Sequence, residues 1–212
     1  MNKRQVAIGV DVGTGGVRAL AVDLSGNVLV SAEVRFPAGT TTVAGPRVQQ
    51  DPRCWTRSAE TALQQLVGQL SADLDLVGVC VDATSGTFLL LDALNQPLTA
   101  GVMYNDQRAV EVTRDVAECI DDELAKYGIR IASSFALPKI VHLFRETPAL
   151  REQCRRIVHQ TDWIVGLLTG NFEVTDISTA LKTGASPGAL AWPAALEELG
   201  ISREMYPRIG LP

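Results

Sequence analysis

The chain has 212 residues, of which 46% are hydrophobic and 20% are charged, and its formal net charge is −5. These values are typical of a soluble globular protein, and they exclude a disordered chain, a collagen-like chain and a coiled coil. The acidic balance offers no broad surface for nucleic acid or for an anionic membrane, and we expect neither as a partner. The four cysteines contain no C-x-x-C pair, so we expect a reduced, cytoplasmic protein without a disulfide framework.

The first third of the chain predicts a sheet followed by a helix. Apolar runs rich in β-branched residues predict strands over residues 6–10, 17–23 and 28–36. Because short turns connect these strands, they must run antiparallel. A Gly-, Thr- and Pro-rich stretch over residues 37–46 predicts a loop. Asp51 and Pro52 predict the N-cap and first residue of an amphipathic helix that ends near Leu70.

The remaining sequence predicts two more strands and then mostly helices. The strands cover residues 76–81 and 86–92. Apolar residues at helical spacing predict helices over residues 107–127, 135–146 and 161–169, the last ending at Gly170. The order of three strands, a helix, two strands and further helices indicates an α/β fold.

The segment from Asp11 to Gly16 combines a carboxylate, a hydroxyl and three glycines at the end of a strand. Glycines allow a tight turn and let several backbone N–H groups point at one anion. Thr14 offers a hydroxyl donor to a phosphate oxygen, and Asp11 is suited to hold Mg²⁺ beside that anion. We therefore expect a phosphate-binding turn, with Arg18 on the next strand within reach of a phosphate.

Two well-known phosphate loops do not fit this segment. No Lys-Ser/Thr pair follows the glycines, as a P-loop requires. The next element is a strand, whereas a dinucleotide-binding fingerprint opens a helix. The alternative is a Gly-rich hairpin with an exposed Asp11, and Arg18 taken alone is more often a solvated strand residue.

Two later segments carry polar side chains suited to a polyol. Asp82, Thr84 and Ser85 lie where one strand ends and the next hairpin begins, and short hydroxyls on rigid elements suit a sugar. Asp106 and Arg108 lie just before a predicted helix. Each segment also has a local alternative, because Thr and Ser side chains cap their own backbone and Asp is a common helix N-cap.

The two histidines offer no metal site, because neither has Cys, Asp or Glu at a typical ligand spacing. His142 falls within an apolar helical pattern and is expected to pack there. His159 precedes a turn and is expected to be solvated.

The run from Ile8 to Arg18 resembles the opening of the FGGY carbohydrate kinases, whose fold is shared with actin and the heat-shock ATPases. Further segments follow in the order of that family: Gln50–Pro52 with Trp55, Val81–Thr87, Tyr104–Arg108, Thr161–Trp163 and Thr175–Gly184. Tyr104–Arg108 is similar to the family's W-N-D-x-R segment, with Tyr in place of Trp. Residues 82–87 look most like ribulokinase-like and D-ribulose kinase-like members, while the Asn-Asp-x-Arg form is shared with xylulokinases.

The resemblance implies a ribonuclease H-like α/β fold, with a mixed sheet of order β-β-β-α-β followed by additional strands and helices. It implies an N-terminal kinase domain over residues 1–205, with residues 206–212 as the start of a linker to a C-terminal domain. The implied reaction is Mg²⁺- and ATP-dependent phosphorylation of a ketopentose, either D-ribulose, L-ribulose or D-xylulose. The catalytic base and the adenosine site are expected in the C-terminal domain, so this chain alone is expected to be inactive.

The resemblance also assigns residues to ligands. The phosphates of ATP are expected to meet Asp11, Gly13, Thr14, Gly15, Gly16 and Arg18, with Asp11 near the metal ion. The sugar is expected to meet Asp82, Thr84, Ser85, Tyr104, Asp106 and Arg108. Thr84 and Ser85 stand where xylulokinases have Met-His, which leaves the sugar open. Dimers are common in the family, so a homodimer is a further expectation.

Three other classes of protein remain as alternatives. An actin-like or chaperone-like ATPase module would share the first turn but would not explain residues 82–87 and 104–108. A non-catalytic interaction domain would keep the fold without the reaction. A Rossmann dehydrogenase fits least, because its first glycine-rich turn would lead into a helix.

Overall fold

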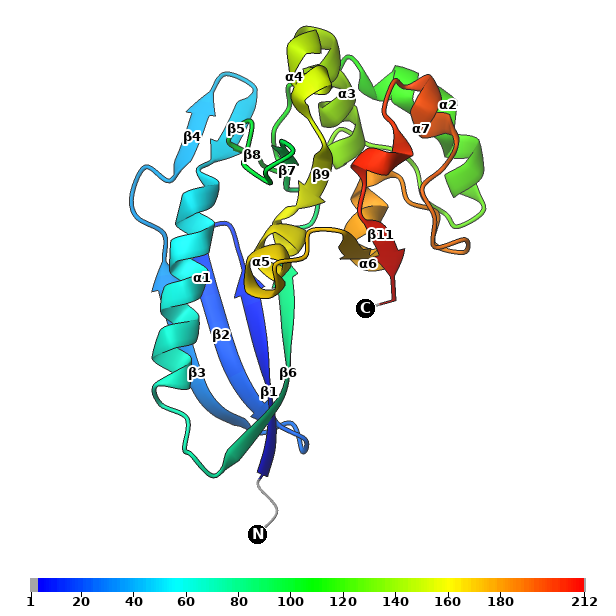
Figure 1. Cartoon of the computed structure of the whole chain (residues 1–212). Coiled ribbons are helices and arrows are strands. Elements are labelled where there is room, and N and C mark those ends of the chain that lie inside the picture. The colour runs from blue at the N-terminus through cyan, green and yellow to red at the C-terminus, as the bar shows by residue number, and fades with distance from the viewer. Residues whose placement is uncertain (1–3, 212) are drawn as a thin grey trace. The chain divides into compact units, whose positions relative to one another are not determined.

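The computed structural model describes residues 4–211, which form two compact units (Figure 1). Unit 1 contains the chain up to Thr40 together with Asp51–Thr84, and unit 2 contains Thr41–Gln50 and the chain from Ser85 onward. The N-terminal domain predicted over residues 1–205 therefore consists of two units. Its boundary with a linker stays a prediction, and Pro212 lies outside the described residues.

Unit 1 is built on a four-stranded sheet with the strand order β3-β2-β1-β6. Its strands are β1 Arg4–Val12, β2 Gly16–Asp23, β3 Val28–Arg35 and β6 Leu74–Ala83. β2 is antiparallel to both β1 and β3, as the short turns predict, and β6 is parallel to β1. All four strands predicted in this unit are confirmed, each within a few residues of its expected bounds.

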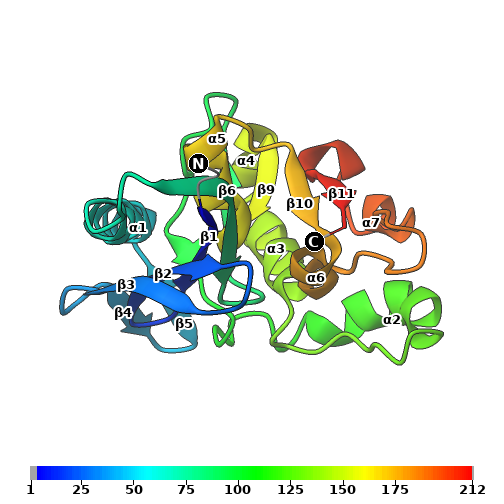
Figure 2. The same ribbon diagram turned by 90° about the horizontal axis from the view of Figure 1, so that it is seen from below.

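One helix, α1 Pro52–Val67, covers one face of this sheet (Figure 2). Asp51 caps it by accepting a hydrogen bond from the Arg53 N–H, and Pro52 occupies its first turn, as predicted. The helix ends at Val67, slightly before the expected Leu70. Its buried side chains pack against β2, where every second residue is buried, and against β3, where Ala32 is buried. The buried apolar residues of the helix are Cys54, Trp55, Ala59, Ala62 and Leu66.

The edge strand β6 differs from its neighbours because its apolar side chains are exposed. Leu76, Val77 and Val79 have exposed fractions of 48%, 49% and 48%. The strand pairs with β1 along one edge, and no described strand pairs with its other edge. Native proteins usually cover or charge such edges, because an open edge with apolar side chains promotes pairing with another chain.

Unit 2 contains a five-stranded sheet with the order β4-β5-β8-β7-β9, in which every pairing is antiparallel. Its strands are β4 Thr41–Ala44, β5 Arg47–Gln50, β8 Gly101–Val102, β7 Phe88–Leu91 and β9 Arg156–His159. The strand predicted over residues 86–92 is confirmed as β7. The loop predicted over residues 37–46 is wrong in part, because β4 lies within it and pairs with β5.

The predicted helices of unit 2 are confirmed, with one shifted start. α3 Ala136–Glu146 and α5 Gln160–Thr169 match closely, and Gly170 ends α5 with a left-handed φ of 74°. α2 Thr113–Ala125 begins six residues after the predicted 107, because residues 107–112 form turns. The short helices were not predicted; they are α4 Pro148–Gln153, α6 Ile177–Ala180, η1 Leu181–Thr183, α7 Ala195–Glu198 and η2 Arg203–Met205.

Helices α2 and α3 share an apolar core with the inner side of β7 and β9. The C-terminal segment belongs to the same unit: β11 Arg208–Gly210 pairs in parallel with β10 Val174–Asp176. Tyr206 is buried in the core and stacks on Trp192, with ring centroids 4.2 Å apart. No helix among residues 4–211 is both long and apolar enough to cross a bilayer.

Candidate functional site

The turn between β1 and β2 lies beside a hollow of about 380 Å³ in unit 1. The Gly13 N–H closes the turn on the Gly16 carbonyl at 3.0 Å, and the Phe36 N–H donates to the Gly15 carbonyl at 2.9 Å. A Cβ on Gly16 would lie 2.5 Å from the Val34 carbonyl oxygen, so β3 can approach only a glycine there. The turn thus fixes the predicted phosphate-binding residues along one hollow. Its lining comprises Asp11, Gly13, Thr14, Gly15, Gly16, Val17, Arg18, Glu33 and Arg35.

The charges around this hollow come from three strands and balance in sign. Arg18 and Arg35 are positive, and Asp11 and Glu33 are negative. The Glu33 carboxylate lies 3.5 Å from Arg18 and 3.8 Å from Arg35. All three of these side chains are at least half exposed, and ion pairs of this kind contribute little. An anion in the hollow could therefore replace the Glu33 carboxylate as the partner of Arg18 and Arg35 at small energetic cost.

Glu33 and Arg35 were not among the predicted site residues. The signal that could have found them is the hairpin turn at residues 25–27, because a short turn fixes the register of the strands it joins. In the resulting ladder Arg18 pairs with Glu33 and Gly16 with Arg35. Residues 33 and 35 therefore lie directly beside the glycine-rich turn.

Asp82 and Thr84 lie at the end of β6 in unit 1. The parallel ladder pairs Asp82 with Asp11, which puts the two carboxylates on neighbouring strands and on the same face. The N–H and the hydroxyl of Thr84 donate to the Val12 carbonyl at 3.2 and 3.4 Å. The hydroxyl thus bonds the end of the neighbouring strand β1, 72 residues away in the sequence, and not its own backbone.

A cation near Asp11 would find few protein ligands. Among the described residues, no group of three or more His, Cys, Asp or Glu side chains is arranged to hold a metal ion. Mg²⁺ in nucleotide sites is typically bound by one or two carboxylates, with phosphate oxygens and water completing its shell. The exposed pair of Asp11 and Asp82 fits that pattern when a polyphosphate is present.

The other predicted sugar-binding residues lie in unit 2. Ser85 is exposed and precedes Gly86, whose φ is +81° and whose Cα lies against the Ser134 carbonyl. Thr87 is fully buried, and its hydroxyl accepts a hydrogen bond from the Tyr104 N–H at 3.3 Å. Tyr104 as a whole residue is 39% exposed. The segments around Ser85 and Tyr104 are therefore joined directly.

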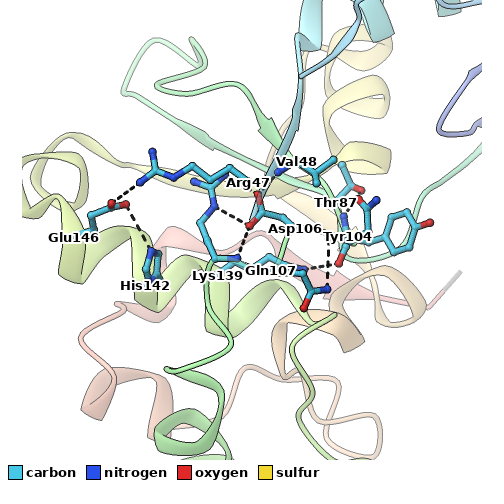
Figure 3. Close-up of polar contacts among 11 residues, drawn as sticks. Arg47, Val48, Thr87, Tyr104, Asp106, Gln107, Lys139, His142 and Glu146 are labelled. Atoms are coloured by element: carbon cyan, nitrogen blue, oxygen red, sulfur yellow. Dashed lines mark hydrogen bonds and ion pairs between the residues drawn. The ribbon is translucent and has the colours of Figure 1, made fainter. Parts of the chain in front are cut away.

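Asp106 is fully buried and bonded on both oxygens (Figure 3). Oδ1 accepts from the Arg108 N–H and Nε at 3.1 and 2.8 Å, and Oδ2 accepts from Arg108 Nη2 and the Val48 N–H, both at 2.7 Å. Burial alone would raise the pKa of Asp106, but the bonds from Arg108 and Val48 outweigh it and hold the pKa below its usual value. The helix that follows is capped by Val112, so Asp106 is not its N-cap.

This geometry restricts what Asp106 can do. A sugar hydroxyl could reach its carboxylate only if one of these four donors gave way. Arg108 is itself only 4% exposed. The Asp106–Arg108 pair therefore fixes the backbone of the Tyr104–Arg108 segment. Only the exposed atoms of that segment are accessible to a ligand.

His159 is buried, which makes the expectation of a solvated side chain wrong. Its Nδ1 lies 2.8 Å from Asp162 Oδ2, and its Nε2 lies 2.5 Å from Thr183 Oγ1. Asp162 also accepts from the His159 N–H at 2.8 Å and so caps α5. With the proton on Nδ1, Nε2 accepts from the Thr183 hydroxyl. Because all three side chains are buried, the arrangement is structural and ties α5 to η1.

The comparisons with known proteins agree with this fold. A family model described as "FGGY family of carbohydrate kinases, N-terminal domain" matches residues 6–210. A xylulose kinase from Lactococcus lactis is 25% identical over 83% of this chain and 35% of its own length. A ribulokinase from Geobacillus thermodenitrificans is 28% identical over 86% of this chain and 37% of its own length. A kinase structure from Brucella ovis, 23% identical, covers 97% of this chain and 42% of its own, with a TM-score of 0.88.

The chain therefore has the mixed α/β fold of the actin-like ATPases and sugar kinases. It belongs to the FGGY family of carbohydrate kinases and corresponds to the family's N-terminal domain. The chain spans little more than a third of the length of these curated relatives. The family match favours the carbohydrate kinases over the Rossmann dehydrogenases and the actin-like or chaperone-like ATPase modules.

Proposed function

We propose that the chain supplies the phosphate-binding turn and part of the sugar-binding site of an ATP-dependent kinase that acts on a ketopentose. The relatives are named xylulose kinase and ribulokinase, which supports D-xylulose, D-ribulose or L-ribulose as the substrate. The observation that carries the proposal is the hollow beside the Asp11–Gly16 turn in a chain of this family. Phosphoryl transfer needs little covalent chemistry from the protein and depends on positioning and on charge.

In this proposal each part of the hollow has its own task. The backbone of Gly13, Gly15 and Gly16 lines the path of the phosphates, and the Thr14 hydroxyl donates to a phosphate oxygen. Arg18 offsets phosphate charge. Asp11 orients the hydrated metal ion, with Asp82 beside it on β6. Mg²⁺, when bound with ATP, supplies neutralisation of the charge on the transferred phosphoryl group.

The sugar is proposed to contact the exposed parts of the two joined segments in unit 2. Ser85 offers a hydroxyl, and Tyr104 offers an exposed ring and hydroxyl. The buried pair of Asp106 and Arg108 fixes the conformation of the Tyr104–Arg108 segment. Contact between the sugar and these two side chains stays a prediction. Asp82 and Thr84 belong to the other unit, and their predicted contact with the sugar is likewise untested.

The reaction also needs parts that the described residues do not supply. The catalytic base and the adenosine pocket are proposed to lie in a C-terminal domain of the same polypeptide. The exposed apolar side chains of β6 fit a covering element from that domain, because an uncovered apolar edge strand is unfavourable. A cytoplasmic location and a homodimer stay predictions.

The test is calorimetric titration of the chain with Mg²⁺–ATP and, separately, with each ketopentose. We expect Asp11→Asn to weaken Mg²⁺–ATP binding and to leave sugar binding unchanged, while Asp122→Asn on the exposed side of α2 serves as the matched control. Equal binding of Mg²⁺–ATP by the wild type and by Asp11→Asn would refute the proposed metal role. Turnover of a pentulose by residues 1–212 alone would refute a base in a further domain.

A further inference from the structure

Lys139 is a fully buried lysine in the first turn of α3. Its ammonium group donates to the Tyr104 carbonyl at 2.7 Å (Figure 3). It also donates to the Ser134 carbonyl at 3.1 Å. Neither acceptor is charged, and neither lies on the same helix as Lys139. The side chain therefore connects α3 with the loop before it and with the segment that leads to Asp106.

The position is unfavourable for a cation. The first turn of a helix is the positive end of its dipole, and a buried ammonium loses its hydration. The charged side chains that act on it are Asp106 and Arg108 from the loop before α2 and Lys182 from η1. Burial is the main cause that lowers the pKa of Lys139, which lies at about 8; Asp106 opposes this shift, while Arg108 and Lys182 add to it. A contribution to stability therefore does not explain why a lysine stands here.

The two carbonyls that Lys139 holds belong to the surroundings of the predicted sugar site. The Tyr104 carbonyl is anchored by Lys139, while the Tyr104 N–H is anchored by the Thr87 hydroxyl. The Ser134 carbonyl lies against Gly86, where an added Cβ would come within 3.0 Å of it. One ammonium group thus fixes the backbone next to Ser85 and the backbone that carries the Tyr104 ring.

We propose that Lys139 is a positioning residue that sets the affinity for the sugar by fixing the Tyr104–Arg108 segment against the Ser85–Thr87 turn. The proposal rests on the proposed function, because it assigns the sugar to these two segments. Loss of its proton weakens both hydrogen bonds, since charge-assisted bonds are the stronger ones. The sugar affinity should therefore decrease as the pH rises through about 8.

The experiment compares the wild type with Lys139→Met and with a matched control, Lys126→Met, whose lysine is exposed after the end of α2. Hydrogen exchange at the amides of residues 103–108 is measured without sugar at one pH. Ketopentose binding is then measured by calorimetry between pH 7 and 9.5. We expect Lys139→Met to lose protection at the Tyr104 amide and to bind the sugar about tenfold more weakly at pH 7, a coupling of ordinary size. We expect the wild type alone to lose affinity with a midpoint near pH 8.

Each outcome decides one claim. Unchanged exchange at residues 103–108 in Lys139→Met would overturn the positioning role, whatever the sugar does. Faster exchange with unchanged affinity would overturn the link to the sugar. If the wild type binds no ketopentose at any pH, the proposed function fails by itself, and the exchange data still show whether Lys139 fixes the segment. If Lys139→Met does not fold, the pH series of the wild type decides: an affinity independent of pH would overturn the proposal.

Discussion

Replacing Asp106 with asparagine should be one of the most destabilising single changes in the chain. Asp106 is fully buried, and its carboxylate accepts four hydrogen bonds, three of them from Arg108. Asparagine would present an amide group to the buried guanidinium and leave its charge uncompensated. Breaking a buried pair by removing one partner typically costs about 3–5 kcal/mol. We therefore expect Asp106→Asn to lower the free energy of unfolding by about 3 kcal/mol in urea denaturation at pH 7.

The chain offers a matched control for this prediction. Asp115 and Arg145 form a pair of the same residue types, with a distance of 2.9 Å, but both side chains are about half exposed. Exposed pairs contribute at most about 1 kcal/mol, so Asp115→Asn should change the unfolding free energy by less than that. The double variant Asp106→Asn with Arg108→Met should recover part of the loss, because the stranded charge is gone. An equal loss of unfolding free energy in Asp106→Asn and in Asp115→Asn would refute the reasoning.

Three further outcomes are expected. Gly16→Ala should destabilise unit 1 by about 1–3 kcal/mol in thermal unfolding, because its Cβ would meet the Val34 carbonyl at 2.5 Å, whereas Gly15→Ala has open space and should be neutral. Val79→Lys on β6 should reduce self-association in sedimentation velocity, and Leu24→Lys, an even more exposed site away from that strand, should not. The free energy of unfolding should rise by about 3 kcal/mol between pH 8 and 10.5. The reason is that Lys139 binds its proton more tightly in the unfolded chain than in the folded chain. An identical rise in Lys139→Met would contradict this prediction.

The sequence predicted unit 1 well because its signals are local. Val6, Ile8, Val10 and Val12 alternate along β1, and the Ser25–Asn27 turn fixes the hairpin. What the pattern could not reveal is the exposure of β6. Its apolar run is typical of a buried strand, but burial depends on which elements lie beside it in space.

Unit 2 was harder to predict because its important contacts are distant in the sequence. The strand β4 was hidden by a Gly- and Thr-rich composition, and the short strand β5 is held in place by pairing with β8 some fifty residues later. The contact between Asp106 and Arg108 joins residues only two positions apart. The bond from Val48 and the ammonium of Lys139 lie 58 and 35 residues from their partners, and no local pattern predicts either. His159 was misjudged for the same reason, since Thr183 approaches it from 24 residues away.

The candidate phosphate-binding region in unit 1 and the candidate sugar-binding region in unit 2 are held together by different interactions. The hollow in unit 1 is formed by glycine backbone and by exposed charged side chains that contribute little to stability. The segment of unit 2 proposed to contact the sugar is held by the buried Asp106–Arg108 pair, whose disruption affects the fold itself, and by the buried Lys139. Variants of Asp11 or Arg18 should therefore change ligand affinity at nearly constant stability. Variants of Asp106 or Arg108 should change ligand affinity and stability together. For Lys139, the pH dependence of sugar affinity and the hydrogen exchange at residues 103–108 separate the two effects.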